Sequence, residues 1–463
     1  MKRMESIKRL VVLQLTGFGQ LVMIAAYGVM WFLYYKQAVN VSFYIKGDIL
    51  VIAVYAILLM FFNSTYGGTK IGYLKAMDVF LSQVFTILAT NAISYAQLAL
   101  MSAKLAHWKP MILFTVCEIV FALIWVFVSD AIYRTVFPPR DLLLVYGERP
   151  YDDIVRKFNT RKDRYNISEK IDIKEGFEKV EEKINERFDG VILWDIPTTD
   201  RNHFIKYCYS KSIRVYMMPK IPDVIIMNAD RMHLFDTPML LTREYALRFE
   251  QRVIKRIIDI CLSLFGIIVT SPVMLLTAFI IKVYDGGPVF YKQVRCTIGN
   301  KEFKIIKFRS MRVDAESDGK ARLASKNDSR ITPFGKFIRK VRIDELPQLF
   351  NILKGDMSFI GPRPERPEII AQYMEEMPEF AFRTRVKAGL AGYAQVYGKY
   401  NTTPYDKLKL DLTYIEGYSL WLDIKLMLLT MKVILSPEAT EGVNENQTTA
   451  LKGKDNGNED SVQ

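Results

Sequence analysis

Histidine is scarce in this chain, and its distribution limits the chemistry that the C-terminal half can perform. The 463 residues include three histidines, His107, His203 and His233, and none follows position 233. Nucleophilic serine or cysteine in the common hydrolases relies on a neighbouring histidine as the base. The C-terminal half cannot build such an arrangement from its own residues, so carboxylates assisted by cations are left as its catalytic groups.

Cysteine is also sparse, and several familiar motifs are missing. The four cysteines are widely scattered and form no CxxC pair, which argues against a zinc knuckle or a disulfide framework and fits a reduced compartment. The sequence has no GxxxxGK(S/T) phosphate loop and no HExxH metal pair. The chemistry of P-loop enzymes and zinc proteases is therefore not expected.

The amino-acid composition indicates a membrane protein that also has soluble parts. Apolar residues make up 50% of the chain and charged residues 24%, and the mean hydropathy is +0.08. The 63 basic and 50 acidic residues give a net charge of +13. This excess fits anionic lipids, phosphates or nucleic acid, and charge alone does not choose among them.

The first 135 residues are predicted to form a four-helix transmembrane bundle. A bilayer core requires about 20 apolar residues per helix, and only the second run is short. Basic residues before the first run and after the fourth favour both ends of the bundle in the cytoplasm. Four buried helices of a soluble protein are the less favoured alternative. The apolar runs cover residues 10–35, 48–62, 79–101 and 110–133.

Residues 136–248 are predicted to form a degenerate Rossmann-like α/β domain. Three buried strands, at 141–147, 190–196 and 213–219, alternate with charged helical segments. The turn after the first strand contains Gly147 but no GxGxxG fingerprint. We therefore favour a structural or regulatory role for this domain over dinucleotide catalysis.

A fifth apolar run, residues 260–281, differs from the first four. Basic residues flank both of its ends, and Ser271 and Pro272 interrupt it at the middle. Proline removes a helical hydrogen bond and kinks a helix. A full crossing would carry a basic domain to the outer face, against the positive-inside tendency. We therefore expect a re-entrant membrane helix over 249–283, with a proline-kinked span as the alternative.

The remaining sequence is predicted to contain the catalytic domain and a tail. Residues 284–436 are basic, of mixed α+β character, and rich in glycine and proline loops. The stretch 410–435 is apolar and amphipathic, as suits a helix lying on a membrane surface. Residues 437–463 are polar and poor in aromatic residues, so a disordered tail is expected.

The best catalytic candidates are the adjacent carboxylates Asp344 and Glu345, in a helix predicted over 339–353. Neighbouring residues on a helix point about 100° apart, so the two carboxylates would have different roles. Asp344 can attack a phosphorus atom, and Glu345 can hold a Mg²⁺ ion that bridges diphosphate oxygens. Arg339 and Arg342 can bind phosphate oxygens. For an isolated pair, a solvated charged face is the usual explanation.

Basic residues on both sides of this helix favour the catalytic interpretation. The segment 307–311 carries Lys307 and Arg309, and the loop 355–367 presents Arg363 between two prolines. Cations grouped around one acidic pair suit a reaction centre for phosphates. Tyr414, Asp423 and Thr430 in the last helix could also line the site, although amphipathic packing explains them nearly as well.

These segments strongly resemble the bacterial sugar transferase family, whose members are polyprenyl-phosphate sugar-phosphate transferases. The resemblance covers about 250–436 and depends on KRIIDI, the mid-helix Ser-Pro, GGPVFYKQVR, KFRSM, DSRITPFGKFIRKVRIDELPQLFNIL, GDMSFIGPRPERP and GLAGYAQVYG. The four preceding apolar runs and the α/β domain match the larger members. Two departures, KAGLAG at 387–392 and the Glu365-Arg366 pair, concern sugar choice more than reaction type.

The resemblance implies a re-entrant helix broken at Ser271-Pro272, with Asp344 as nucleophile, Glu345 as the Mg²⁺-associated residue and Arg339 in contact with phosphate. It further implies a multi-pass protein of the inner (plasma) membrane with a cytoplasmic catalytic domain. The reaction would transfer a hexose-1-phosphate from a UDP-sugar to undecaprenyl phosphate and release UMP. This is the first membrane step in making capsule, exopolysaccharide or O-antigen repeat units.

Other expected partners are membrane lipid and a second copy of the chain, since the α/β domain could support a homodimer; no nucleic acid is expected. Glucose and galactose phosphate are the leading donors by family likeness, with N-acetylated sugars as alternatives. Two other functions compete with transfer. One is a membrane-bound nucleotide-sugar dehydratase or epimerase, against which the missing glycine fingerprint argues. The other is a non-catalytic partner in polysaccharide export, with structural carboxylates.

Overall fold

The structure is a computed structural model that describes residues 2–39, 44–186, 188–242, 246–312, 328, 330–398 and 402–434. The chain divides into two compact units, Met1–Pro219 and Lys220–Gln463, each described here by itself. The boundary at residue 219 lies within the segment 136–248 that the sequence assigns to one α/β domain. The predicted tail, 437–463, lies outside the described residues.

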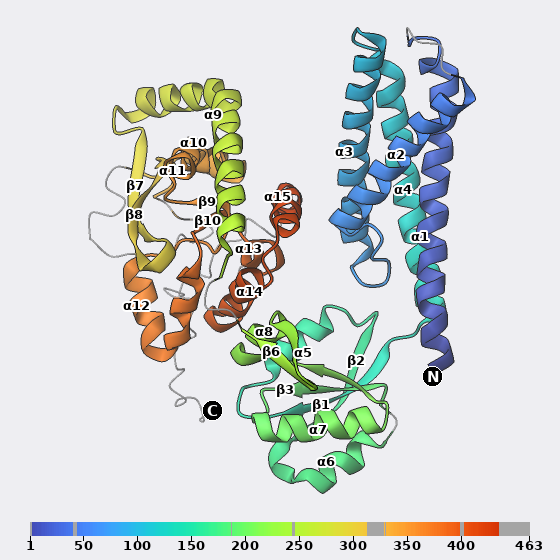
Figure 1. The fold of residues 1–463 in the computed structure, drawn as a ribbon, viewed down its shortest axis with the longest axis vertical. Coiled ribbons are helices and arrows are strands. Elements are labelled where there is room, and N and C mark those ends of the chain that lie inside the picture. The colour runs from blue at the N-terminus through green and yellow to red at the C-terminus, as the bar shows by residue number, and fades with distance from the viewer. Residues whose placement is uncertain are drawn as a thin grey trace, which may run out of the picture. The chain divides into compact units, whose positions relative to one another are not determined.

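Unit 1 begins with four long helices (Figure 1). They are α1 (Lys2–Met30, continued by a π-helical turn Trp31–Tyr35), α2 (Ile45–Tyr66), α3 (Ala76–Ser102) and α4 (Trp108–Val136). With helix α9 (Phe249–Asp285) of unit 2, they make five helices in the described chain that are long and apolar enough to cross a membrane. The four predicted apolar helices are confirmed, and the second has 22 residues rather than being short.

The interior of this bundle is unusually polar. Along α3, Ser82, Thr86, Thr90 and Ser94 recur every four residues and are buried. Glu118 of α4 is buried beside them and accepts hydrogen bonds from Tyr55 and Asn91. Polar side chains can connect membrane helices through hydrogen bonds, so these residues contribute to packing within the bundle.

A parallel sheet completes unit 1. Its strand order is β2-β1-β3-β4, with helices in the connections. This confirms the parallel α/β region, whereas β2 is polar and was not predicted. A Cβ on Gly147 would meet the Asp195 carbonyl at 2.3 Å, so this glycine allows β1 and β3 to end close together. The elements are β1 (Arg140–Tyr146), α5 (Asp152–Asn159), β2 (Tyr165–Asp172), α6 (Phe177–Ile184), β3 (Gly190–Trp194), α7 (Thr198–Ser210) and β4 (Arg214–Met217).

Unit 2 begins with α8 (Ile221–Met227) and a hairpin of β5 (Asp230–Leu234) and β6 (Thr237–Leu241). The 37-residue helix α9 (Phe249–Asp285) follows and is sharply bent (Figure 1). Pro272 lies inside α9 and lacks the N–H that would bond to the Ile268 carbonyl. The Ser271 hydroxyl donates to this carbonyl instead, at 2.8 Å. The Ser-Pro pair therefore bends the helix without leaving that acceptor unpaired.

The rest of unit 2 is an α+β assembly of short elements packed on α9. Met274 and Ile281 of α9 share a buried core with Phe308 and Ile338. The elements are β7 (Phe290–Cys296), β8 (Glu302–Phe308), α10 (Pro333–Lys340), α11 (Gln348–Lys354), β9 (Ser358–Ile360), α12 (Pro367–Glu376), β10 (Gly389–Ala391), α13 (Tyr393–Tyr397), α14 (Pro404–Glu416) and α15 (Leu420–Ile434). Strands β7 and β8 pair antiparallel, and β9 and β10 pair parallel.

Candidate active site

The two candidate carboxylates lie in a turn rather than in a long helix. The continuous helix predicted over 339–353 is wrong: α10 ends at Lys340, and Ile343–Glu345 form a 3₁₀ turn before α11 begins at Gln348. Arg342 has a left-handed backbone, with φ of 59°, which ends the first helix. A tight turn holds Asp344 and Glu345 at a sharp change of direction, where both side chains can face one site.

Local contacts attach this turn to β8. Thr332 caps α10 by accepting from the Gly335 amide at 2.9 Å. A Cβ on Gly335 would meet the Ser310 carbonyl at 2.0 Å, so only glycine allows the helix to start this close to the end of β8. On the other side, Asn351 of α11 bonds to the backbone of Ile306 and Lys304, at 3.0 and 2.9 Å. These contacts set the distance between the carboxylates and the strand that carries Lys307.

Glu345 is surrounded by cations. Lys307 donates to its Oε1 at 3.0 Å, and Arg342 Nη1 lies 3.8 Å from the same oxygen. Burial raises the pKa of this carboxyl, but the charges of Lys307, Arg363 and Arg342 outweigh burial and lower the pKa to about 2. Glu345 is therefore ionised at every pH at which the protein would work.

The pKa of Asp344 shifts in the opposite direction, although Asp344 directly precedes Glu345 in the sequence. Asp344 is 8% exposed, and its Oδ1 has no hydrogen-bond partner among the described residues. Burial and then the charge of Glu345 raise the pKa of Asp344 to about 6, against the lowering effects of Lys307, Arg339 and Arg342. A buried carboxylate without a partner, ionised at neutral pH and surrounded by cations, suits a nucleophile.

Four of the five cationic residues predicted for the site lie near the carboxylate pair, and the fifth packs elsewhere. Lys307, Arg339, Arg342 and Arg363 all affect the pKa of at least one of the two carboxyls. Arg309 is buried, and its guanidinium packs against Gly287, where an added Cβ would meet Nη1 at 2.5 Å. Four predicted cations thus gather around the pair, whereas Arg309 packs under the Gly-Gly-Pro turn. The other two residues that the sequence singled out, Ser271 and Pro272, are not cations and lie within helix α9.

The basic start of α9 attaches that helix to the rest of unit 2. Lys255 forms a buried ion pair with Asp423 of α15 at 2.5 Å, and Tyr414 donates to the same carboxylate at 2.8 Å. Arg256 donates to the last carbonyls of α11, at 2.7 and 2.6 Å. Asp423 and Tyr414, which the sequence suggested as site-lining residues, therefore hold α9 on the rest of unit 2.

The residues around the pair fit a magnesium ion that is shared with a substrate. Mg²⁺ commonly uses one or two protein carboxylates and completes its shell with water and phosphate oxygens. The described residues contain no group of three or more His, Cys, Asp or Glu side chains that could enclose a metal by themselves. The partnerless Oδ1 of Asp344 and the adjacent Glu345 carboxylate could supply oxygen ligands for such an open site.

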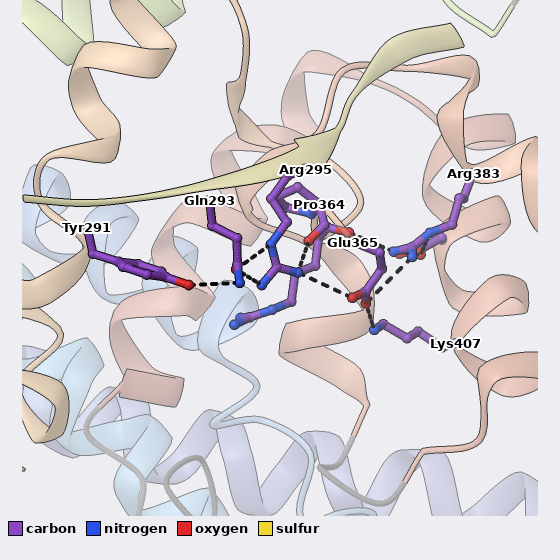
Figure 2. Close-up of polar contacts among 9 residues, drawn as sticks. Tyr291, Gln293, Arg295, Pro364, Glu365, Arg383 and Lys407 are labelled. Atoms are coloured by element: carbon purple, nitrogen blue, oxygen red, sulfur yellow. Dashed lines mark hydrogen bonds and ion pairs between the residues drawn. The ribbon is translucent and has the colours of Figure 1, made fainter. Parts of the chain in front are cut away.

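Sequence reasoning missed a second charged cluster, centred on Glu365 of the loop after β9 (Figure 2). Its carboxylate contacts three cations, Arg295, Arg383 and Lys407. The sequence distances range from 18 to 70 residues, so no local motif signals the cluster. Its only sequence signal was the unusual Glu365-Arg366 pair after the Pro-Arg-Pro.

The fold and the site together define a membrane-associated protein with a basic, carboxylate-containing centre built on an apolar helix. Residues 250–437 match the bacterial sugar transferase family. The chain is also 38% identical over 192 residues to the uncharacterized sugar transferase EpsL of Bacillus subtilis, covering 92% of that protein and 42% of this chain. The chain belongs to the bacterial sugar transferase family, as its motifs indicated.

Longer relatives carry more specific names. A UDP-N-acetylgalactosamine-undecaprenyl-phosphate N-acetylgalactosaminephosphotransferase of Aeromonas hydrophila is 39% identical over 260 residues, which is 54% of this chain and 60% of the relative. A UDP-glucose:undecaprenyl-phosphate glucose-1-phosphate transferase of Xanthomonas campestris is 35% identical over 251 residues, 52% of each chain. The aligned part thus spans just over half the length of these two relatives.

Proposed function

We propose that this protein transfers a hexose-1-phosphate from a UDP-sugar to undecaprenyl phosphate, releasing UMP, as the first membrane step of extracellular polysaccharide repeat-unit synthesis. One observation carries the proposal: the buried, partnerless carboxylate of Asp344 lies among cations that belong to elements packed on α9. Phe308 and Ile338 share a buried core with α9. Phe308 directly follows Lys307 in the sequence, and Ile338 directly precedes Arg339. The site is thus close to an apolar helix, as a lipid-borne acceptor requires.

In the first step, an ionised Asp344 oxygen attacks the sugar-bearing phosphorus of the donor. The bond from this phosphorus to the bridging oxygen breaks, and UMP leaves with the electron pair. The sugar phosphate is then held on Asp344 as an acyl phosphate. In the second step, a phosphate oxygen of undecaprenyl phosphate attacks the same phosphorus, which breaks the phosphorus–oxygen bond to Asp344 and regenerates its carboxylate.

The cations make this exchange between anions feasible. Arg339, Arg342 and Arg363 would bind diphosphate oxygens and offset the repulsion between the donor and the Asp344 carboxylate. Lys307 keeps Glu345 ionised and oriented. Mg²⁺, held by Glu345 with Asp344 beside it, would neutralise further charge on the diphosphate when bound.

The same proposal fixes the membrane arrangement. Helices α1–α4 form a four-span bundle, and α9, bent at Ser271-Pro272, enters and leaves the same leaflet, so that unit 2 stays at the cytoplasmic face where UDP-sugars are made. The Rossmann-like domain has a structural or regulatory role and supports a homodimer. The packing of Gly147 against Asp195 accounts for the glycine without a bound dinucleotide and favours transfer over a dehydratase.

The sugar is a hexose or an N-acetylhexosamine. The named relatives divide between glucose and N-acetylgalactosamine. The family match over residues 250–437 includes the carboxylate pair, so the similarity supports the reaction more strongly than it supports one sugar.

A donor panel tests the proposal. Purified protein in lipid nanodiscs would be given undecaprenyl phosphate, Mg²⁺ and each of four radiolabelled donors: UDP-glucose, UDP-galactose and their N-acetylated forms. We expect one donor to give label in the lipid fraction with stoichiometric UMP. Release of UDP instead of UMP, or no lipid-linked label from any donor, would refute sugar-phosphate transfer by this chain.

A further inference from the structure

The loop from Pro362 to Glu365 is fixed at four successive carbonyls. The Pro362 carbonyl accepts from the Gly389 amide at 2.9 Å, and the Glu365 carbonyl accepts from the Cys296 amide at 3.0 Å. Between them, the carbonyls of Arg363 and Pro364 accept from two arginine side chains. Two of the four residues are prolines with restricted backbones. The backbone of this loop is therefore held rigidly through its carbonyl groups.

The two arginines in this set are Arg383 and Arg295. Arg383 Nη2 donates to the Arg363 carbonyl at 2.9 Å, and Arg295 Nη1 donates to the Pro364 carbonyl at 3.1 Å (Figure 2). Each arginine is oriented by further partners. Arg383 bonds to Asp411 at 2.8 and 3.1 Å, and Arg295 bonds to the Gln293 side chain. Both guanidinium groups are thus used as fixed supports for the loop.

Glu365 lies between these supports. Its Oε2 is 3.7 Å from Arg295, its Oε1 is 3.7 Å from Arg383, and Lys407 donates to Oε1 (Figure 2). The side chain of Glu365 is 12% exposed. Without its negative charge, three nearby cations would face one another with Asp411 as the nearest counter-charge, and they would separate. Together with Asp411 and Gln293, Glu365 therefore keeps both arginines in reach of the loop, and it is the one carboxylate that contacts both of them among the ion pairs of the described residues.

The loop presents Arg363, whose side chain is used differently. It is half-buried and makes no hydrogen bond or ion pair to a described residue. Its charge nevertheless lowers the pKa of both Glu345 and Glu365. Arg363 thus lies within electrostatic range of both carboxylates, one in the reaction centre and one in the support. A cation carried on a rigidly held backbone, with unused side-chain donors, suits recognition of a diphosphate.

We infer that Glu365 is a positioning residue: with Arg295 and Arg383 it holds the loop so that Arg363 meets the diphosphate of the donor. This rests on the proposed function, because the diphosphate is that of a UDP-sugar. Glu365 itself touches neither substrate nor reacting atom. Removing the charge of Glu365 should therefore have no further effect on donor binding in a variant that already lacks the Arg363 side chain.

A double-mutant cycle tests this dependence. Glu365→Gln keeps the shape of the side chain and removes its charge, and Arg363→Met removes the recognising cation. We expect each single variant to raise the KM for the donor, and the Kd for UDP, about tenfold, with a smaller change in kcat. The combined variant should be no worse than Arg363→Met alone. Glu368→Gln, an exposed carboxylate three residues away, is the matched control and should match the unaltered protein.

Several outcomes would overturn the inference. Effects of Glu365→Gln and Arg363→Met that multiply in the combined variant would show that Glu365 acts independently of Arg363, and an unchanged KM in Glu365→Gln would show no role. If Glu365→Gln is not recovered folded, Arg383→Lys gives the same test, because it keeps the charge and removes the guanidinium hydrogen bond to the Arg363 carbonyl.

The same measurements separate the positioning role from the proposed function. A protein that transfers sugar phosphate but gives a multiplicative cycle refutes only the positioning role. One that binds UDP but transfers nothing refutes the proposed function, and its UDP cycle still decides the positioning role. One that does neither refutes both.

Discussion

Glu118 in the bundle of unit 1 and the glutamates Glu345 and Glu365 in unit 2 are largely removed from solvent, but their charges are compensated in opposite ways. Glu118 in the bundle is held by neutral donors, the Tyr55 hydroxyl and the Asn91 amide. Glu345 and Glu365 in unit 2 are held by lysine and arginine. Neutral hydrogen bonds satisfy a polar group without creating a field, whereas an excess of cations creates a field that attracts anions. The comparison separates polar groups that hold helices together from polar groups that bind a substrate.

Replacing Asp344 by Asn should produce the largest effect. We expect transfer to fall at least ten-thousandfold, because no carboxylate remains to attack the donor. The same change should stabilise the fold at pH 8 by about 1–3 kcal/mol. Burial raises the pKa of Asp344 to about 6, so the native state favours the protonated form and loses stability as pH rises through 6.

UMP release and thermal unfolding at pH 8 and at pH 4 measure these two effects. The stability gain should vanish at pH 4, where Asp344 is protonated in the native state. Glu375→Gln, at an exposed carboxylate of α12, is the control for both assays. Residual turnover near the unaltered rate, or a lower unfolding temperature at pH 8, would contradict the nucleophilic, desolvated carboxylate.

Breaking the Lys255–Asp423 pair should be the next largest change. Lys255→Met leaves the Asp423 carboxylate buried without a cation, which we expect to cost about 3–5 kcal/mol in the stability of unit 2. Thermal unfolding in detergent measures the loss. Lys255→Met combined with Asp423→Leu should recover most of it. If the combined variant is as unstable as the single one, lost packing rather than the unpaired charge is responsible.

Lys307→Met should weaken the site and shift its pH dependence. Lys307 lowers the pKa of both Asp344 and Glu345, so its removal raises both. Because Asp344 must be ionised to attack, the acidic limb of the kcat/KM profile, expected near pH 6, should move to higher pH, with an activity loss of about a hundredfold at neutral pH. Lys304→Met, at an exposed position of the same strand, is the control. An unmoved limb would exclude this electrostatic role.

The bundle should give the smallest effects. Glu118→Gln keeps hydrogen-bonding atoms for Tyr55 and Asn91 and should leave the unfolding temperature and transfer in vitro almost unchanged. Glu118→Leu leaves those donors unpaired and should cost about 1 kcal/mol. A loss in Glu118→Gln as large as that in Lys255→Met would mean that the charge of Glu118 itself stabilises the bundle.

Much of the fold was predictable because it follows from local patterns. The apolar runs and the strands at 141–147, 190–196 and 213–219 depend on neighbouring residues, and all of them are confirmed as helices or strands. Strand β2 was missed because it lies at the edge of the sheet and is mostly exposed, so its sequence lacks a buried strand pattern. The helix predicted over 339–353 is interrupted at two places. Pro347, the N-cap of α11, is a local signal for a break that the prediction did not use, whereas nothing local signals the left-handed conformation of Arg342.

The sequence alone determined the chemical inventory: no histidine after position 233, the adjacent carboxylates Asp344 and Glu345, groups of cations and five apolar segments. Only the tertiary structure decided how these groups act on one another. Asp344 and Glu345 are neighbours, yet burial and cations from distant segments drive the pKa of one up and that of the other down. Glu365 likewise depends on partners up to 70 residues away. Burial and Coulomb energies depend on distance in space, which only the folded chain defines.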